Sequence, residues 1–133
     1  MVGASPQGGG LLEAAAGYLF HRAGCANPFR ISRMLVLAAW RGLPLLDEMR
    51  VEGEPYGFSI PEVALAIQRW ISSGCAERDE ANKCVRYLCA RPDLPDFERS
   101  ILDSVYEEVK DLPDVELNRR VIRDPRYREL ISR

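Results

Sequence analysis

The most reactive side chains in this chain belong to four cysteines and one histidine. They are His21, Cys25, Cys75, Cys84 and Cys89. No two cysteines have the C-x-x-C spacing, and the histidine stands four residues before the first cysteine, so the sequence does not indicate the four converging ligands of a zinc site. The spacing favours reduced thiols that pack as small hydrophobic side chains. The alternative is a disulfide between Cys75 and Cys84, which flank a predicted turn, although intracellular disulfides are rare outside hyperthermophiles. We expect no metal and no cofactor.

No set of residues in the sequence indicates catalysis. The chain has no Gly-rich phosphate loop, no serine or cysteine nucleophile next to a plausible base, and no carboxylate pair marked out by its surroundings. His21 lies on a predicted helix without a group that would orient its ring. We therefore expect a protein that is not an enzyme.

Basic side chains in the middle of the chain indicate a different chemistry, the binding of phosphates. In a winged helix-turn-helix, the helix before the hairpin lies toward the major groove and the hairpin, or wing, lies near the DNA backbone. This arrangement would place Glu62, Ala66 and Arg69 toward the bases. The alternative for each arginine is a solvated surface charge paired with a neighbouring acid. The candidate nucleic-acid-binding residues are Arg30, Arg33, Glu62, Arg69, Arg78, Lys83 and Arg86.

The elements that would position these side chains follow one another between residues 54 and 90. Ser59 and Glu62 have the spacing of a capping box, and Pro61 suits the first helical turn. Gly74 is a typical residue after a helix end, and two short strands would then flank a polar turn at 79–82. This order of turn, helix and hairpin predicts the core of a winged helix. The apolar stripe of the helix consists of Ile60, Val63, Ile67, Trp70 and Ile71.

The remaining sequence predicts further helices. Asn27 followed by Pro28 is a helix cap with proline at the first helical position. A short extended segment at 49–51 would correspond to the first strand of many winged helices. Helices are expected at 11–22, 28–41, 96–110 and 114–122, with a last turn or helix that ends at Arg133.

These elements define a mostly α (α+β) fold class, with a winged helix-turn-helix-like core, a β-hairpin and additional C-terminal helices. Residues 1–10 are expected to form a flexible arm because they are rich in glycine. Residues 11–92 would form the winged-helix-like core. Residues 93–133 would form a helical extension that packs on this core, so that the chain is a single domain.

Composition limits the class of protein further. The chain has 133 residues, 47% of them hydrophobic, and a net charge of −2. Residues 1–92 carry ten basic and nine acidic side chains, and residues 93–133 carry eight and eleven, so neither part has the strong basic excess of many nucleic-acid-binding domains. No apolar run approaches the ~20 residues that span a bilayer, and no secretory signal is recognisable. We expect a cytoplasmic protein without membrane contact.

Three short motifs resemble those of the Panacea/SocA-like domain and its prokaryotic relatives. They are residues 31–37 (ISRMLVL), 55–59 (PYGFS) and 71–77 (ISSGCAE), and residues 115–117 and 124–127 resemble the tails of those proteins. The resemblance covers roughly residues 11–130. It implies a winged-helix-like helical domain that acts through protein contacts, as a neutraliser of toxins or an adaptor for proteolysis.

Two functions remain open at this point. The first is a regulator that binds duplex DNA through the predicted helix and wing. The second is a protein-interaction module, such as a toxin-neutralising or adaptor protein or a subunit of a larger assembly, and a homodimer is also open. The sequence slightly favours the first.

Overall fold

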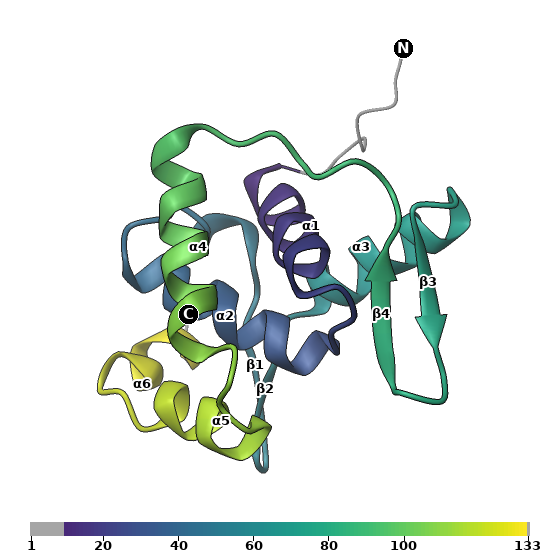
Figure 1. Ribbon diagram of the computed structural model, residues 1–133. Coiled ribbons are helices and arrows are strands. Elements are labelled where there is room, and N and C mark those ends of the chain that lie inside the picture. The colour runs from purple at the N-terminus through teal and green to yellow at the C-terminus, as the bar shows by residue number, and fades with distance from the viewer. Residues whose placement is uncertain (1–9, 133) are drawn as a thin grey trace.

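The helices and strands form a mostly helical structure with two small antiparallel hairpins (Figure 1). The computed structural model describes residues 10–132. All of the predicted N-terminal arm except Gly10 therefore lies outside the described residues. The elements are α1 (Leu11–Ala23), α2 (Pro28–Trp40), η1 (Leu46–Glu48), β1 (Glu52–Glu54), β2 (Gly57–Ser59), α3 (Pro61–Ser72), β3 (Ala76–Asp79), β4 (Cys84–Tyr87), α4 (Asp96–Val109), α5 (Asp114–Ile122) and α6 (Arg126–Ile131).

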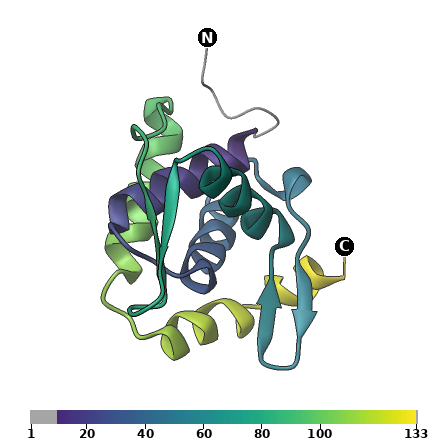
Figure 2. The same ribbon diagram turned by 90° about the vertical axis from the view of Figure 1, so that its right-hand side faces the viewer.

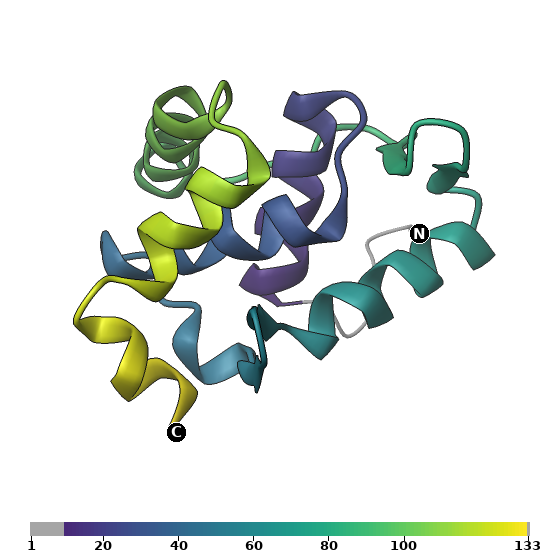
Figure 3. The same cartoon turned by 90° about the horizontal axis from the view of Figure 1, so that it is seen from below.

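Helices α1 and α2 form the centre of the molecule. Helix α3 packs on one side of α1, and α4 and α5 pack along α2 on the other side (Figure 3). The central helices carry side chains that are fully shielded from water, such as Leu19, Phe20 and Leu35. Burial of this apolar surface is the main force that holds the helices together. The C-terminal helices therefore complete the same core.

The predicted helix ends are confirmed where the signal is local. The Asn27 side chain caps α2 by accepting a hydrogen bond from the Arg30 amide at 2.8 Å. Gly74 follows α3 with a φ of 82°, a conformation that favours glycine over other residues. Trp70 is buried as predicted, but Ile71 is 36% exposed and lies outside the buried stripe of α3.

The predicted capping box at the start of α3 is wrong. Ser59 is the last residue of β2, and the cap position is Ile60, which makes no side-chain cap. Pairing with β1 holds Ser59 in the strand, one residue too early for its hydroxyl to cap the helix. Glu62 instead accepts two hydrogen bonds from Arg50, one from its backbone amide and one from its side chain, both at 2.9 Å.

The short extended segment predicted at 49–51 includes Met49, which has extended backbone, but the strand itself lies further along the chain. Strand β1 begins at Glu52 and, among residues 10–132, pairs with β2 alone. The two hairpins are therefore separate sheets (Figures 1 and 2). A different segment extends the second hairpin: Ala26, between α1 and α2, exchanges backbone hydrogen bonds with Val85 of β4 at 2.8 and 3.1 Å.

The four cysteines form two disulfides, so the expectation of reduced thiols is wrong, and so is the alternative of a Cys75–Cys84 bridge. Cys25 is bonded to Cys84, and Cys75 is bonded to Cys89. The register of the hairpin explains the pairing, because Asp79 is the residue that lies opposite Cys84. Cys75 lies at the open end of the hairpin, near Cys89. The first disulfide ties the β3–β4 hairpin to the loop between α1 and α2.

Candidate functional site

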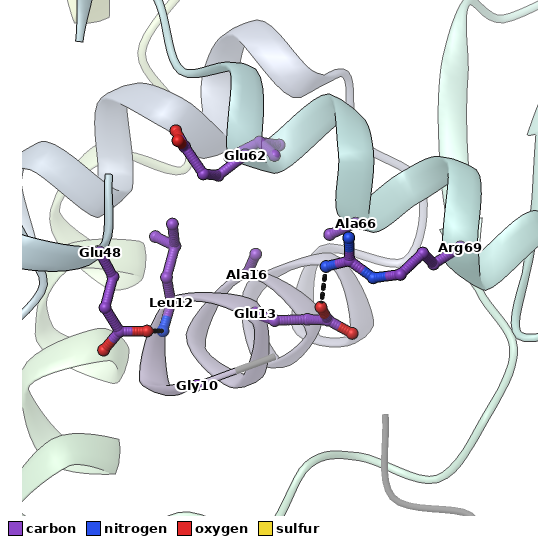
Figure 4. Close-up of a pocket in the computed structure, with 9 residues that line it drawn as sticks. Gly10, Leu12, Glu13, Ala16, Glu48, Glu62, Ala66 and Arg69 are labelled. Atoms are coloured by element: carbon purple, nitrogen blue, oxygen red, sulfur yellow. Dashed lines mark hydrogen bonds and ion pairs between the residues drawn. The ribbon is translucent and has the colours of Figure 1, made fainter. Parts of the chain in front are cut away.

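The side of α3 that the sequence predicts to contact DNA packs against α1 instead (Figure 4). Ala66 is buried, and Arg69 points toward Glu13 of α1 and pairs with it. Glu62 lies at the edge of the small cavity between the two helices, whose volume is about 80 Å³. The prediction that Ala66 faces a major groove is therefore wrong, because this side of α3 belongs to the helix packing.

Arg69 is held where it is by a buried carboxylate. The Glu13 side chain is 5% exposed and accepts hydrogen bonds from Arg69 and, at 3.1 Å, from the Trp70 indole. A buried charge that loses its partner is strongly destabilising. If Arg69 moved to a phosphate, Glu13 would lose the charge that compensates it. Arg69 therefore stabilises the buried Glu13, and 49% of its own side chain is exposed.

Arg30 also has a place in the packing. Its guanidinium donates hydrogen bonds to the backbone carbonyls of Val109 at 3.0 Å and Leu112 at 2.7 Å. It also pairs with Asp114 at 2.8 Å. Cations at a helix C-terminus satisfy carbonyls that have no partner within the helix and complement the helix dipole. Arg30 thus fixes the passage from α4 to α5.

The predicted wing residues differ in their surroundings. Arg86 pairs with Glu77 and Asp79, which lie on the neighbouring strand. Hydrogen bonds from Asn82 and Arg86 lower the pKa of Asp79 to about 2, so this carboxylate is charged at neutral pH. Within residues 10–132, Arg78 and Lys83 are exposed and have no ion pair. These two side chains are the part of the predicted set that remains free for phosphates.

The prediction that Arg33 contacts nucleic acid is wrong, because its side chain is buried. Arg33 is instead the centre of a site that the sequence did not indicate. It is 2% exposed, and its guanidinium lies 3.7 Å from the ring centre of Phe29 and 4.0 Å from that of Phe58. Within residues 10–132 no carboxylate forms a salt bridge with it. Burial lowers its pKa to about 10. Such a buried cation costs desolvation energy that hydrogen bonds and aromatic contacts must offset.

Arg33 acts on the turn between β1 and β2 through Asn118. Its Nε and Nη2 atoms donate to Oδ1 of Asn118 at 3.1 and 3.0 Å. The Asn118 amide in turn donates to the backbone carbonyl of Tyr56 at 3.0 Å. The Tyr127 hydroxyl donates to the carbonyl of Gly57 at 2.9 Å. Side chains of α5 and α6 thus fix two adjacent carbonyls of this turn, and Arg33 of α2 orients the α5 side chain.

Gly57 allows this close approach, and Tyr56 is the side chain that the turn presents. A Cβ atom at position 57 would lie 2.5 Å from Nη2 of Arg33. The Tyr56 side chain points away from the network and is 90% exposed. A large aromatic residue is therefore kept in water on a backbone whose position is fixed.

A groove lies between this turn and α5, with a volume of about 670 Å³. Its apolar residues include Val115, which is 59% exposed, and its rim carries both acidic and basic side chains. We call this region the Tyr56 groove. It is lined by Phe29, Glu54, Pro55, Tyr56, Gly57, Asp114, Val115, Asn118, Arg119, Ile122, Arg123 and Tyr127.

The sequence drew attention to residues 55–58 as a turn but gave no sign of the groove, since Arg33 and Asn118 are 85 residues apart. No family model, curated protein or solved structure matches this chain. Within residues 10–132, no helix combines the length and apolar character needed to cross a lipid bilayer.

Proposed function

We propose that this protein is a protein-interaction module that binds its partner through the Tyr56 groove. The observation that carries the proposal is the 90% exposure of Tyr56 on a turn fixed by Asn118 and Tyr127. Rigid, exposed tyrosines lose little conformational entropy on binding and are enriched among residues that dominate binding energy. The resemblance to the Panacea/SocA-like domain supports the same class of role, and Tyr56 lies in one of the motifs that carry it.

The groove fits a folded protein that offers a pocket for one aromatic ring and an apolar side chain for the space beside Val115. Exposed apolar residues bordered by polar ones mark interaction sites in many proteins. Glu54 and Asp114 on the rim carry negative charge, and Arg119 and Arg123 carry positive charge. A partner with both signs of charge suits this rim better than a uniformly charged polymer does.

Affinity capture with matched variants tests this role. Phe97 is also an exposed aromatic residue, 63% exposed on α4 and outside the groove, so it is a suitable control. We expect a partner that is retained by the Phe97→Ser protein and lost by the Tyr56→Ser protein. A second copy of the chain as the captured protein would identify a homodimer. Equal capture by both variants would contradict the proposal.

Binding of duplex DNA through the wing is the second candidate. It is favoured by Arg78 and Lys83, which are exposed and have no ion pair within the described residues. The hairpin after α3, extended by the pairing of Ala26 with β4, supports the comparison with a winged helix. Affinity for duplex DNA that falls steeply with salt, and that is reduced in an Arg78→Ala/Lys83→Ala protein, would support this candidate. No binding at low salt would exclude it.

A further inference from the structure

Two cysteines and an aspartate lie close together where the β3–β4 hairpin meets the loop after α1. The Sγ atoms of Cys25 and Cys84 and a carboxylate oxygen of Asp79 all lie within 4.8 Å of one another. The three residues come from different segments, namely the α1–α2 loop, the end of β3 and the start of β4. All three are half-buried, so small ions can approach them.

Two thiolates and one carboxylate are a suitable set of zinc ligands. Zinc bonds of about 2.3 Å to sulfur and about 2.0–2.2 Å to oxygen place tetrahedral ligand atoms roughly 3.5–3.8 Å apart. In the structure the three ligand atoms lie at most 4.8 Å apart, so the carboxylate needs to move by little more than 1 Å to reach the tetrahedral spacing. The two sulfur atoms must separate, which reduction of the disulfide permits. Three protein ligands leave the fourth zinc position to water.

The aspartate is already held in a conformation suited to a ligand. The backbone amide of Asn82 donates to one oxygen of Asp79 at 3.0 Å, and its side-chain amide donates to the other at 2.8 Å. Arg86 also donates to the second oxygen. Hydrogen bonds of this kind orient ligand side chains and tune the metal in known sites.

The surrounding charge suits a metal with three anionic ligands. Two thiolates and a carboxylate carry three negative charges, which exceeds the charge of Zn²⁺ by one. Arg86 contacts the aspartate, and Lys83 lines a cavity of about 440 Å³ beside the sulfur atoms. These cations stabilise the excess negative charge. The cavity gives water access to the fourth position.

We propose that the reduced protein binds one Zn²⁺ through Cys25, Cys84 and Asp79, and that the Cys25–Cys84 disulfide is the metal-free alternative of the same site. Two equivalents of a small thiol reduce the disulfide: the S–S bond breaks, each cysteine gains one proton, and the small thiol is oxidised to its own disulfide. Binding of Zn²⁺ to the two thiols then releases two protons. The Cys75–Cys89 pair has no such role, because within residues 10–132 no other group of metal-binding side chains converges.

Metal titration of the full chain tests the proposal. We expect one Zn²⁺ per reduced chain and none per oxidised chain, measured by elemental analysis after desalting. Cys25→Ser should abolish binding, and Asp79→Asn should weaken it by at least about tenfold. The Cys75→Ser/Cys89→Ser protein is the matched control and should retain one Zn²⁺. Binding that persists in Cys25→Ser, is unchanged in Asp79→Asn, or is absent from the reduced wild type would overturn the proposal.

Alkylation of the wild-type protein gives a second measurement that needs no substitution. In the reduced protein, Zn²⁺ should slow the alkylation of Cys25 and Cys84 at least about tenfold, since bound thiolates are not free to react. Cys75 and Cys89 should react at unchanged rates. If Zn²⁺ leaves all four rates unchanged, the proposal fails even where a variant does not fold.

Discussion

The side-chain amide of Asn118 donates a hydrogen bond to the backbone carbonyl of Tyr56 at 3.0 Å, which joins α5 to the turn between β1 and β2. The same side chain accepts two hydrogen bonds from the buried guanidinium of Arg33. Asn118 therefore connects a costly buried charge to the most exposed aromatic residue of the described chain. The stability of the protein and the position of the exposed Tyr56 side chain therefore depend on the same contacts.

Replacement of Asn118 by alanine should destabilise the protein. The change leaves Arg33 with fewer acceptors, and an unsatisfied buried donor costs about 1–3 kcal/mol, more when it is charged. The midpoint of urea unfolding should fall accordingly. Arg123→Ala is the matched control, because Arg123 lies on the exposed side of the same region and has no ion pair within residues 10–132. It should change the free energy of unfolding by less than about 0.5 kcal/mol. Equal effects would show that the network contributes nothing.

A methyl group at position 57 should disturb the turn. In Gly57→Ala the new Cβ would lie 2.5 Å from Nη2 of Arg33, so the side chain or the turn must move. Overpacking of this kind costs about 1–3 kcal/mol. Gly53→Ala, on the preceding strand, places its Cβ no closer than 4.0 Å to Ile131 and should be tolerated. Thermal unfolding of the two proteins compares them directly, and a Gly57→Ala protein as stable as Gly53→Ala would contradict the geometry.

Substitution of Arg69 should lower the stability of the protein more than substitution of Arg78, although the sequence predicts that both residues contact DNA. Arg69→Ala removes the charge that compensates buried Glu13, and we expect a loss of about 1–3 kcal/mol in the free energy of unfolding. Arg78 has no ion pair within the described residues, so Arg78→Ala should change stability by less than about 0.5 kcal/mol. Chemical denaturation monitored by tryptophan fluorescence measures both changes. Similar values for the two variants would refute the assignment of Arg69 to the fold.

Asp124 should make stability depend on pH. Hydrogen bonds from the side chain and backbone of Arg126 lower the pKa of Asp124 to about 2. Because the folded-state pKa is depressed, the stabilisation is complete above the unfolded pKa of about 4 and is lost as the pH falls through about 2. Asp124→Asn should therefore flatten the fall in unfolding temperature between these pH values. An Asp124→Asn profile that falls as steeply as that of the wild type would contradict this prediction.

Local signals in the sequence were sufficient to predict most helix ends and the second hairpin. Asn27 before Pro28 and Gly74 after Ser73 act on neighbouring backbone, so their effect does not depend on the rest of the fold. Ser59 and Glu62 have the same kind of local pattern, but strand pairing with β1 takes Ser59 away from the helix. A local signal fails where a neighbouring element competes for the same residue.

The contacts that create the groove and the disulfides could not be predicted from spacing. Arg33 meets Asn118 only because α5 packs on α2, and Cys25 meets Cys84 only because the loop after α1 pairs with β4. Both depend on tertiary packing between segments far apart in the sequence. The sequence also gave no reason to expect a buried arginine, since this residue type is rarely buried without a partner.

The cytoplasmic location stays a prediction, and the two disulfides are unusual for that compartment. Disulfides persist in oxidising compartments and are rare in the cytosol, except in hyperthermophiles. A cytoplasmic location therefore requires either such a source or a protein that is reduced in the cell. Peptide mapping of alkylated protein from its natural host distinguishes the bonded from the reduced state.

Site-specific photocross-linking at position 56 is a direct test of protein binding at the Tyr56 groove. A photoreactive phenylalanine derivative replaces Tyr56 in one protein and Phe97 in a control, and both are irradiated in cells of the natural host. We expect a discrete protein adduct from position 56 that is absent from position 97 and is lost when Val115→Arg is added. An adduct of twice the chain mass would identify a second copy as the partner. No protein adduct from position 56, or the same adducts from both positions, would contradict the claim that the Tyr56 groove binds a protein.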